Sequence, residues 1–351
     1  MCVIVTRVLP VDAHSPQPEP IREAADIIRS GGLVAFPTET VYGLGANALD
    51  SKAVDSIFSA KGRPASDPII VHLHDLAQLS TVAINIPDLA YELARQFWPG
   101  PLTFVLQRHS NVPPNVSAGM PTVAVRMPSH PVAIALLRAA NLPVAAPSAN
   151  RFARPSATTA AHVLEDLDGR IDCILDGGAA VIGVESTIID LTKNQPAVLR
   201  PGGINLESLR TLIPGLKVVS KLLHEDDAGI EAPGMLYKHY SPRAELRLFN
   251  GESDVLIPAM RTYALEQIGQ GNKVGFLLPN NELSQVADLP VEVINLGADE
   301  AEVSHNLFSA MRLLDQANVD MILVHTFGQS GLGLALWDRL LRAAEGHIVE
   351  V

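Results

Sequence analysis

The chain has 351 residues, of which 47% are apolar and 18% are charged, a composition that excludes a disordered protein and gives room for two domains. Its net charge of −12 excludes broad, sequence-blind binding of nucleic acid, and its two cysteines can form neither a disulfide framework nor a structural zinc site. No apolar run is long enough for a membrane-spanning helix. We therefore expect a cytoplasmic protein without a membrane segment.

The first part of the chain alternates short apolar runs with helix-like segments. Alternation of apolar residues predicts strands at Leu33–Phe36, Ile69–Leu73, Thr103–Leu106, Thr122–Met127, Val144–Ala146, Ile171–Leu175, Thr187–Leu191 and Ala197–Arg200. Helical periodicity predicts helices at Ile21–Ser30, Ser51–Ala60, Asp88–Phe97, Pro131–Ala140 and Thr159–Leu167. Pro131 suits the start of its helix, and Ser51 is predicted to be an N-cap. Many short strands with fewer helices predict an α/β fold built on a twisted mixed sheet.

The regular pattern is lost between residues 217 and 243 and resumes at residue 244. The later strands are predicted at Ala244–Phe249, Lys273–Leu278, Val291–Leu296 and Met321–His325, and the helices at Ser253–Gly269, Glu300–Gln316 and Gly333–Ala344. This order predicts a smaller, Rossmann-like α/β domain. The predicted organisation is therefore a first domain over 1–216, a linker over 217–243 and a second domain over 244–351.

The predicted linker is rich in side chains that pack. Its residues 229–242 carry Met, Leu, two Tyr, Lys and His, whereas flexible spacers are rich in Gly and Ser. Two interpretations follow: the linker packs on the outside of either domain, or it lies over a pocket of the first domain as a lid.

Acidic charge is concentrated in the linker and the second domain taken together. Residues 1–216 hold 16 lysines and arginines against 19 aspartates and glutamates, a net charge of −3, whereas residues 217–351 hold 10 against 19, a net charge of −9. The first domain can therefore carry a local basic face, and any contact with RNA would be local.

Hydroxyl residues, glycines and two cations follow the predicted strands of the first domain. The segments concerned are Phe36–Gly45, Lys61-Gly62-Arg63-Pro64, Ala146–Asn150 and Val184–Thr187. Loops that follow strand ends gather ligand contacts in α/β proteins, so we expect a site for a polyanion such as a nucleotide phosphate. Neither a P-loop nor a GxSxG elbow occurs, and no histidine has metal-ligand spacing.

Several of these residues also have simpler interpretations. Lys61 and Arg63 could form a solvated surface turn, and His72 could be a satisfied core histidine. Arg126 interrupts an apolar strand, so it needs either a structural salt bridge or a ligand carboxylate. The glycines of Gly328–Gly333 resemble a nucleotide loop, but their spacing is not GxGxxG and a strand-to-helix turn needs glycines as well.

Four motifs in the same order resemble the signatures of the YrdC/Sua5 family, the threonylcarbamoyl-AMP synthases. They are Thr38-Glu39-Thr40-Val41-Tyr42-Gly43-Leu44, Lys61-Gly62-Arg63-Pro64, Pro147-Ser148-Ala149-Asn150 and Val184-Glu185-Ser186-Thr187. The rest of the chain, with a linker that ends His239-Tyr240-Ser241-Pro242, resembles the long, two-domain Sua5 form. The resemblance implies an enzyme that joins L-threonine, bicarbonate and ATP, with Mg²⁺ bound through ATP, into threonylcarbamoyl-AMP and pyrophosphate. A downstream threonylcarbamoyl transferase complex would then modify adenosine 37 of tRNA, and any tRNA contact of this chain would be weak.

The resemblance also implies roles for individual residues. ATP would be bound by Lys61, Arg63, Thr122, Ser148, Asn150, Ser156 and Arg200, among which Lys61 and Arg63 would be catalytic. Threonine would be surrounded by Thr40, His72, Arg126, Ala146 and Ser186, and the lid would contribute Tyr240. Asp67 stands where the family usually has Asn beside ATP, and a carboxylate there would repel phosphate unless Mg²⁺ or an arginine neutralises it.

Two alternatives remain at this point. The first domain could be a tRNA- or double-stranded-RNA-binding module without turnover, which a steep salt dependence of binding would indicate. It could also form a carbamoyl adenylate for another acceptor, as the hydrogenase-maturation carbamoyltransferase does. That larger protein needs cysteine-rich zinc modules, which two cysteines cannot supply.

Overall fold

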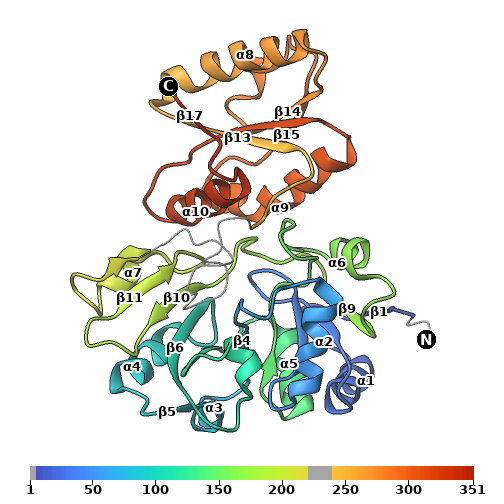
Figure 1. The fold of residues 1–351 in the computed structure, drawn as a ribbon, viewed down its shortest axis with the longest axis vertical. Helices are drawn as coiled ribbons and strands as arrows, with labels where there is room; N and C mark the ends of the chain where they lie inside the picture. Colours follow the sequence, from blue (N-terminus) through green and yellow to red (C-terminus); the bar gives the residue numbers. More distant parts are fainter. Residues whose placement is uncertain (1–4, 220–238) are drawn as a thin grey trace. The chain divides into compact units, whose positions relative to one another are not determined.

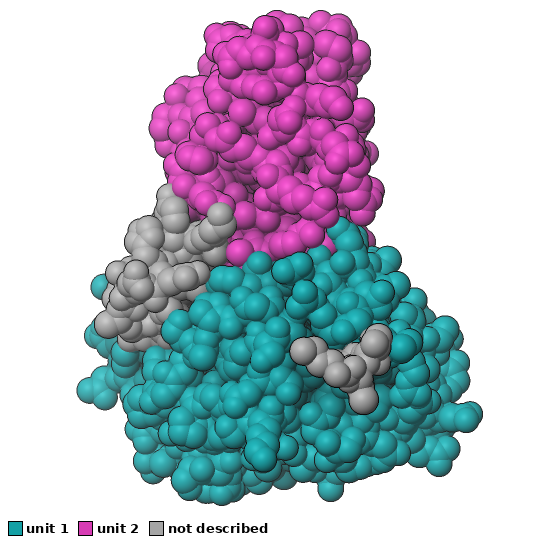
Figure 2. All heavy atoms as spheres, turned by 45° about the vertical axis from the view of Figure 1, so that its right-hand side comes forward, with its two compact units in different colours: residues 1–152, 156–236 teal, residues 153–155, 237–351 magenta. Residues whose placement is uncertain are grey.

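The structure is a computed structural model that describes residues 5–219 and 239–351. The chain divides into two compact units, one of residues 1–152 and 156–236 and the other of residues 153–155 and 237–351 (Figure 2). Most of the predicted linker, residues 220–238, lies outside the described residues. No helix in the described part of the chain is both long and apolar enough to cross a membrane.

Within the described residues, the strands of the first unit form one sheet. Its order is β1-β9-β2-β3-β8-β4-β7-β6-β10-β11-β12, with β5 paired to β6. The strands are β1 (Arg7–Pro10), β2 (Val34–Phe36), β3 (Gly43–Asn47), β4 (Ile70–His72), β5 (Ala83–Ile84), β6 (Leu102–Arg108), β7 (Thr122–Arg126), β8 (Val144–Ala145), β9 (Cys173–Asp176), β10 (Thr187–Asp190), β11 (Ala197–Arg200) and β12 (Lys217–Val218). Because β4 pairs with β7 in parallel and β6 pairs with β7 in antiparallel fashion, the predicted mixed sheet is confirmed.

Helices cover this sheet, and α1 packs against α5 (Figure 1). The helices of the first unit are α1 (Pro18–Arg29), α2 (Ser51–Lys61), α3 (Leu79–Val82), α4 (Asp88–Phe97), α5 (Pro131–Ala140), α6 (Ala160–Leu167) and α7 (Leu206–Arg210), with short 3₁₀ turns η1 (Leu76–Gln78) and η2 (Pro114–Ser117). Helix α4 and helix α5 have the predicted bounds, and Pro131 is the first residue of α5. The predicted N-cap at Ser51 is wrong, because the Asp50 carboxylate accepts hydrogen bonds from the backbone N–H groups of Lys52 and Ala53.

Strand β3 was not predicted, since its sequence is rich in glycine. It pairs in antiparallel fashion with both β2 and β8, so it lies inside the sheet. A Cβ atom on Gly45 would lie 2.8 Å from the Phe36 ring and 2.9 Å from Val144 Cγ1. The glycine therefore allows neighbouring strands to approach closely, which sequence periodicity does not reveal. Strands β1, β5 and β12 were also missed, and β5 and β12 have only two residues each.

The second unit has a five-stranded sheet in the order β15-β14-β16-β13-β17, and every described pairing is parallel. Its strands are β13 (Glu245–Asn250), β14 (Val274–Leu278), β15 (Glu292–Asn295), β16 (Met321–His325) and β17 (Ile348–Glu350). Its helices are α8 (Ser253–Gly269), α9 (Glu300–Gln316) and α10 (Gly333–Ala343), with the 3₁₀ turn η3 (Leu283–Val286). This arrangement confirms the smaller, Rossmann-like α/β domain.

The second unit includes three residues from the middle of the chain. Arg312 Nη2 donates a hydrogen bond of 2.6 Å to the carbonyl oxygen of Pro155, and Arg154 lies 3.5 Å from the Asp315 carboxylate. The backbone N–H of Ser241 donates to the carbonyl oxygen of Ala153 at 2.7 Å. The unit is therefore discontinuous in sequence, a feature that the predicted boundaries did not contain.

Candidate functional site

Predicted site residues share one face of two neighbouring strands. Thr122, Ala124 and Arg126 alternate along β7, so their side chains point to the same face. In the parallel pair of β4 with β7, Ile70 is opposite Ala124 and His72 is opposite Arg126. The sheet therefore places a residue predicted for ATP on the same face as two residues predicted for threonine.

A small apolar cluster occupies this face between the polar residues. It consists of Ile70, Val105, Ala124, Ile188 and Leu199, with Phe152 packed against it. The cluster is separate from the two larger cores of the unit. The cluster forms the apolar base of this face. The hydroxyl of Thr122, the imidazole of His72 and the guanidinium of Arg126 lie on the same face.

Arg126 is buried and is held at three positions. Its Nε donates to the carbonyl oxygen of Gly100 at 3.2 Å, and its Nη1 donates to Thr40 Oγ1 at 2.9 Å. Its Nη2 lies 2.7 Å from Oε1 of Glu39. The structure thus shows the salt bridge that the sequence left as one of two interpretations. Glu39 was not predicted as a site residue, although it stands inside the first quoted motif.

His72 is also buried, with an exposed fraction of 3%. Burial, and then the neighbouring Arg126 charge, lower the pKa of His72 from 6.5 to about 3. Its Nδ1 lies 3.3 Å from the carbonyl oxygen of Ile70. The imidazole is therefore neutral at working pH and can act only as a neutral hydrogen-bonding group.

Ser186 and Arg200 meet where β10 and β11 run side by side. Arg200 donates to the carbonyl oxygen of Ser186 from Nε at 3.2 Å and from Nη2 at 3.0 Å. The hydroxyl of Ser186 lies 2.8 Å from the hydroxyl of Thr103, whose strand position is opposite Arg126. These contacts link the predicted threonine residues to the predicted nucleotide residue Arg200.

Lys61 joins the second motif to the third. It is the last residue of α2, and its side chain is buried. Its Nζ donates to the carbonyl oxygen of Ser148 at 2.5 Å and also to that of Asn150. The alternative of a solvated surface turn is therefore wrong for Lys61.

Arg63 is buried as well, beside the residue that departs from the family pattern. Its Nη2 lies 2.8 Å from Asp67 Oδ2 and donates to the carbonyl oxygen of Pro68 at 2.8 Å, and its Nε donates to the carbonyl oxygen of Asp67. The solvated turn is thus wrong for Arg63 too. The arginine that would neutralise the Asp67 carboxylate is the one predicted to be catalytic.

Tyr42 connects three segments of the site. Its backbone N–H donates to the carbonyl oxygen of Ala157, and its own carbonyl oxygen accepts from the N–H of Ala149, each at 2.8 Å. Its hydroxyl donates to the carbonyl oxygen of Gly178 at 2.7 Å. Burial, and then the Asp176 charge, raise the pKa of Tyr42, so its hydroxyl remains a donor.

The remaining predicted residues are placed by single contacts. The hydroxyl of Ser156 donates to Glu185 Oε1 at 2.5 Å, and the backbone N–H of Ala146 donates to the carbonyl oxygen of Ile70 at 2.9 Å. Glu185, like Tyr42 and Glu39, belongs to a quoted motif but received no role from the sequence. Motif membership was the only signal that could have indicated these three residues.

Tyr240, the predicted lid residue, belongs to the second unit. Its ring stacks on that of Phe308, with 5.3 Å between centroids, and Arg339 Cζ lies 5.4 Å from its centroid. The role of Tyr240 as a lid stays a prediction.

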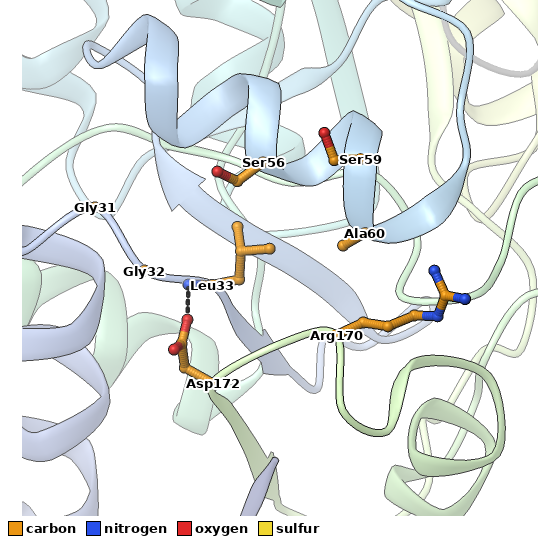
Figure 3. A pocket seen from close by; sticks show the side chains of 8 residues that line it. All are labelled: Gly31, Gly32, Leu33, Ser56, Ser59, Ala60, Arg170 and Asp172. Atoms are coloured by element: carbon orange, nitrogen blue, oxygen red, sulfur yellow. Dashed lines mark hydrogen bonds between the residues drawn. The ribbon is translucent and has the colours of Figure 1, made fainter. Parts of the chain in front are cut away.

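A cavity of about 360 Å³ lies elsewhere in the first unit (Figure 3). Its lining includes Gly32, Ser56, Ser59, Arg170 and Asp172, and none of the predicted site residues lines it. The Asp172 carboxylate accepts a hydrogen bond of 2.8 Å from the backbone N–H of Leu33, as Figure 3 shows. This bond gives Asp172 a structural role at the edge of the cavity.

The glycine-rich loop of the second unit leads into α10. The first N–H of that helix, on Gly333, donates to Glu300 Oε2 at 3.2 Å. A carboxylate therefore meets the helix start, where a nucleotide phosphate would otherwise bind. This contact supports the interpretation of Gly328–Gly333 as a strand-to-helix turn.

Comparisons with known proteins agree along nearly the whole chain. A family model for Sua5, YciO and YrdC, described as telomere recombination, matches residues 26–202, and a model described as the C-terminal domain of threonylcarbamoyl-AMP synthase matches residues 204–345. Proteins named threonylcarbamoyl-AMP synthase from Pyrococcus abyssi and Bacillus subtilis are 46% and 42% identical to this chain, over 94% and 97% of it and 96% of each relative. The crystal structure of P. abyssi Sua5 complexed with L-threonine is similar with a TM-score of 0.93 and 44% identity, over 99% of this chain and 100% of that one. The chain therefore belongs to the Sua5/YciO/YrdC family, in its two-domain form.

Proposed function

We propose that this chain catalyses the formation of threonylcarbamoyl-AMP and pyrophosphate from L-threonine, bicarbonate and ATP. The observation that carries the proposal is the full-length similarity to relatives of that name. A third such relative, from Schizosaccharomyces pombe, is 41% identical over 92% of this chain. The chain is thus an enzyme of the nucleotidyltransferase type, and these relatives favour turnover over an RNA-binding module.

The proposed threonine site is built around Arg126. A guanidinium can bind a carboxylate through two parallel N–H groups, and the buried position of Arg126 strengthens such a contact. Thr40, His72 and Ser186 offer neutral hydrogen-bonding groups close to it. The similar P. abyssi Sua5 was solved with L-threonine, which supports threonine as the amino acid.

The proposed ATP site is built around Lys61 and Arg63. Both cations are buried and both are held by backbone carbonyl oxygens, so they are fixed before ATP binds. The other proposed contacts are Thr122, Ser148, Asn150, Ser156 and Arg200. Fixed cations stabilise negative charge at little reorganisation cost, which suits them to the triphosphate.

The chemistry follows from these groups. The threonine ammonium group first loses a proton; the resulting amine attacks the carbon of bicarbonate, and loss of water gives a carbamate. A carbamate oxygen then attacks the α-phosphorus of ATP, the bond to the bridging oxygen breaks, and pyrophosphate leaves with the electron pair. Such a phosphoryl transfer depends on positioning and on charge stabilisation more than on a strong base. We assign the charge stabilisation to Lys61 and Arg63.

Magnesium is proposed to enter with ATP. The described residues contain no group of three or more His, Cys, Asp or Glu side chains that could hold a metal ion. Mg²⁺ is commonly bound through substrate phosphates with few protein ligands, so these residues are compatible with it. When bound, the ion would neutralise part of the triphosphate charge. The product would pass to a threonylcarbamoyl transferase complex for tRNA modification.

Pyrophosphate release tests the proposed function. Purified full-length chain with Mg²⁺ should release pyrophosphate when threonine, bicarbonate and ATP are all present, and release should fall to background when any one is omitted. Folding would be checked in parallel by circular dichroism. A folded, Mg²⁺-replete protein that released no pyrophosphate would contradict the proposal.

A further inference from the structure

Glu39 and Arg126 form a buried ion pair whose closest two atoms are not aligned for a hydrogen bond. The Nε and Nη1 groups of Arg126 make aligned hydrogen bonds to Gly100 and Thr40. Its Nη2 lies 2.7 Å from Glu39 Oε1, yet the two atoms are not aligned as donor and acceptor. Within residues 5–219 and 239–351, neither Nη2 nor Oε1 makes an aligned hydrogen bond. The carboxylate therefore compensates the charge of Arg126 by its closeness to Nη2, and both atoms are shielded from solvent.

Glu39 is itself fixed in place. Its exposed fraction is 7%, and its second oxygen, Oε2, accepts a hydrogen bond of 3.1 Å from the backbone N–H of Ser129. Its carbonyl oxygen accepts from the N–H of Ile182 at 2.8 Å. Because Glu39 is anchored through both its side chain and its backbone, its carboxylate can hold the neighbouring guanidinium in one orientation.

We propose that Glu39 is a positioning residue that holds the Arg126 guanidinium ready for the carboxylate of threonine. The inference rests on the proposed threonine site and adds a residue to which the family resemblance gave no role. A buried guanidinium without a counter-charge would be costly and would turn toward any other acceptor. Glu39 prevents this before threonine binds, because its carboxylate supplies the counter-charge beside Nη2 while Gly100 and Thr40 hold Nε and Nη1.

The test separates positioning of Arg126 from a general loss of structure. Full-length wild type and Glu39→Gln would be titrated with L-threonine and with L-threoninol, in which a hydroxymethyl group replaces the carboxylate. In Glu39→Gln the affinity for threonine should fall about tenfold or more, as expected when a charge-assisted hydrogen bond is weakened. The affinity for threoninol should change less than about twofold, because that ligand has no carboxylate for Arg126 to bind.

Asp190→Asn is the matched control, since Asp190 is buried in the same unit and its carboxylate contacts Thr192 and Lys193, two and three residues later in the chain. It should lower the thermal midpoint without changing the ratio of the two affinities. If Glu39→Gln does not fold, Glu39→Asp keeps the charge but shortens the side chain, and it should give an intermediate ratio.

Two results would overturn the inference: a wild-type ratio in a folded Glu39 variant, or equal losses for threonine and threoninol. A wild type that failed to distinguish the two ligands would instead contradict the proposed threonine site.

Discussion

The ammonium group of Lys61 donates a hydrogen bond of 2.5 Å to the carbonyl oxygen of Ser148, a residue 87 positions later in the chain. The same nitrogen donates to the carbonyl oxygen of Asn150. One buried cation thereby orders a turn whose hydroxyl and amide side chains are proposed ATP contacts. Lys61 therefore has two roles in the proposed site: it supplies a positive charge, and it holds the Ser148–Asn150 segment in place.

Replacing Lys61 with alanine should lower kcat/KM for pyrophosphate release by about 10²–10³-fold, because a fixed positive group facing the triphosphate is lost. Lys52→Ala is the matched control, since Lys52 lies on the same helix and is exposed. The measurement is steady-state pyrophosphate release at several ATP concentrations. Equal activities in the two variants would contradict the assignment of Lys61.

Asp67→Asn should lower the thermal stability of the protein without ATP and increase its stabilisation by ATP. Loss of the carboxylate leaves buried Arg63 without its described ion-pair partner, while the backbone oxygens of Asp67 and Pro68 still hold the guanidinium. We expect a lower thermal midpoint without ATP and a larger upward shift with saturating ATP than in wild type. Asp190→Asn should lower the midpoint without enlarging that shift. An ATP-induced shift no larger than in wild type would show that Asp67 does not oppose phosphate binding.

His72 should make the protein sensitive to acid. Its pKa is about 3 when folded, against an ordinary value of 6.5, so the unfolded chain binds more protons between these values. Stability from this group is therefore complete above pH 6.5 and is lost as the pH falls toward 3, by up to about 1.4 kcal/mol per pH unit. In His72→Gln, the thermal midpoint should fall less steeply between pH 6.5 and pH 4 than in wild type. His14→Gln, at an exposed position, should keep the wild-type slope, and a wild-type slope in His72→Gln would contradict the expected neutral imidazole.

Gly202→Ala should disturb the segment that carries Ser186. A Cβ atom at this position would overlap the carbonyl oxygen of Glu185 and lie 2.5 Å from the backbone nitrogen of Thr187. Because backbone atoms cannot move aside like a flexible side chain, we expect a lower thermal midpoint together with a higher KM for threonine. Gly269→Ala is the control, since a Cβ there, at the end of α8, meets open space. It should be neutral or slightly stabilising, and a wild-type KM for threonine in Gly202→Ala would show that the segment tolerates displacement.

The sequence predicted the strands and helices that hold the site better than it predicted the contacts within it. Apolar alternation is a local signal, so β4, β7, β10 and β11 were placed within one or two residues. Strand β3 was missed because its glycines serve close packing, which only the neighbouring strands reveal. The motif resemblance indicated the cations and hydroxyls, but it could not show that Glu39 pairs with Arg126. Glu39 and Arg126 are 87 positions apart in the sequence, and their side chains meet only when the sheet has formed.

The discontinuity of the second unit limits how the protein can be divided. Three of its residues, 153–155, are encoded in the middle of the longer unit, and their described partners include Arg312 and Asp315. If the gene were divided near codon 216, the first product would keep residues 153–155 without their partners in the second unit. The second product would lack these three residues, which contact Arg312 and Asp315. The second unit therefore cannot be exchanged between homologues as one continuous segment. An exchange would have to replace residues 153–155 together with residues 237–351.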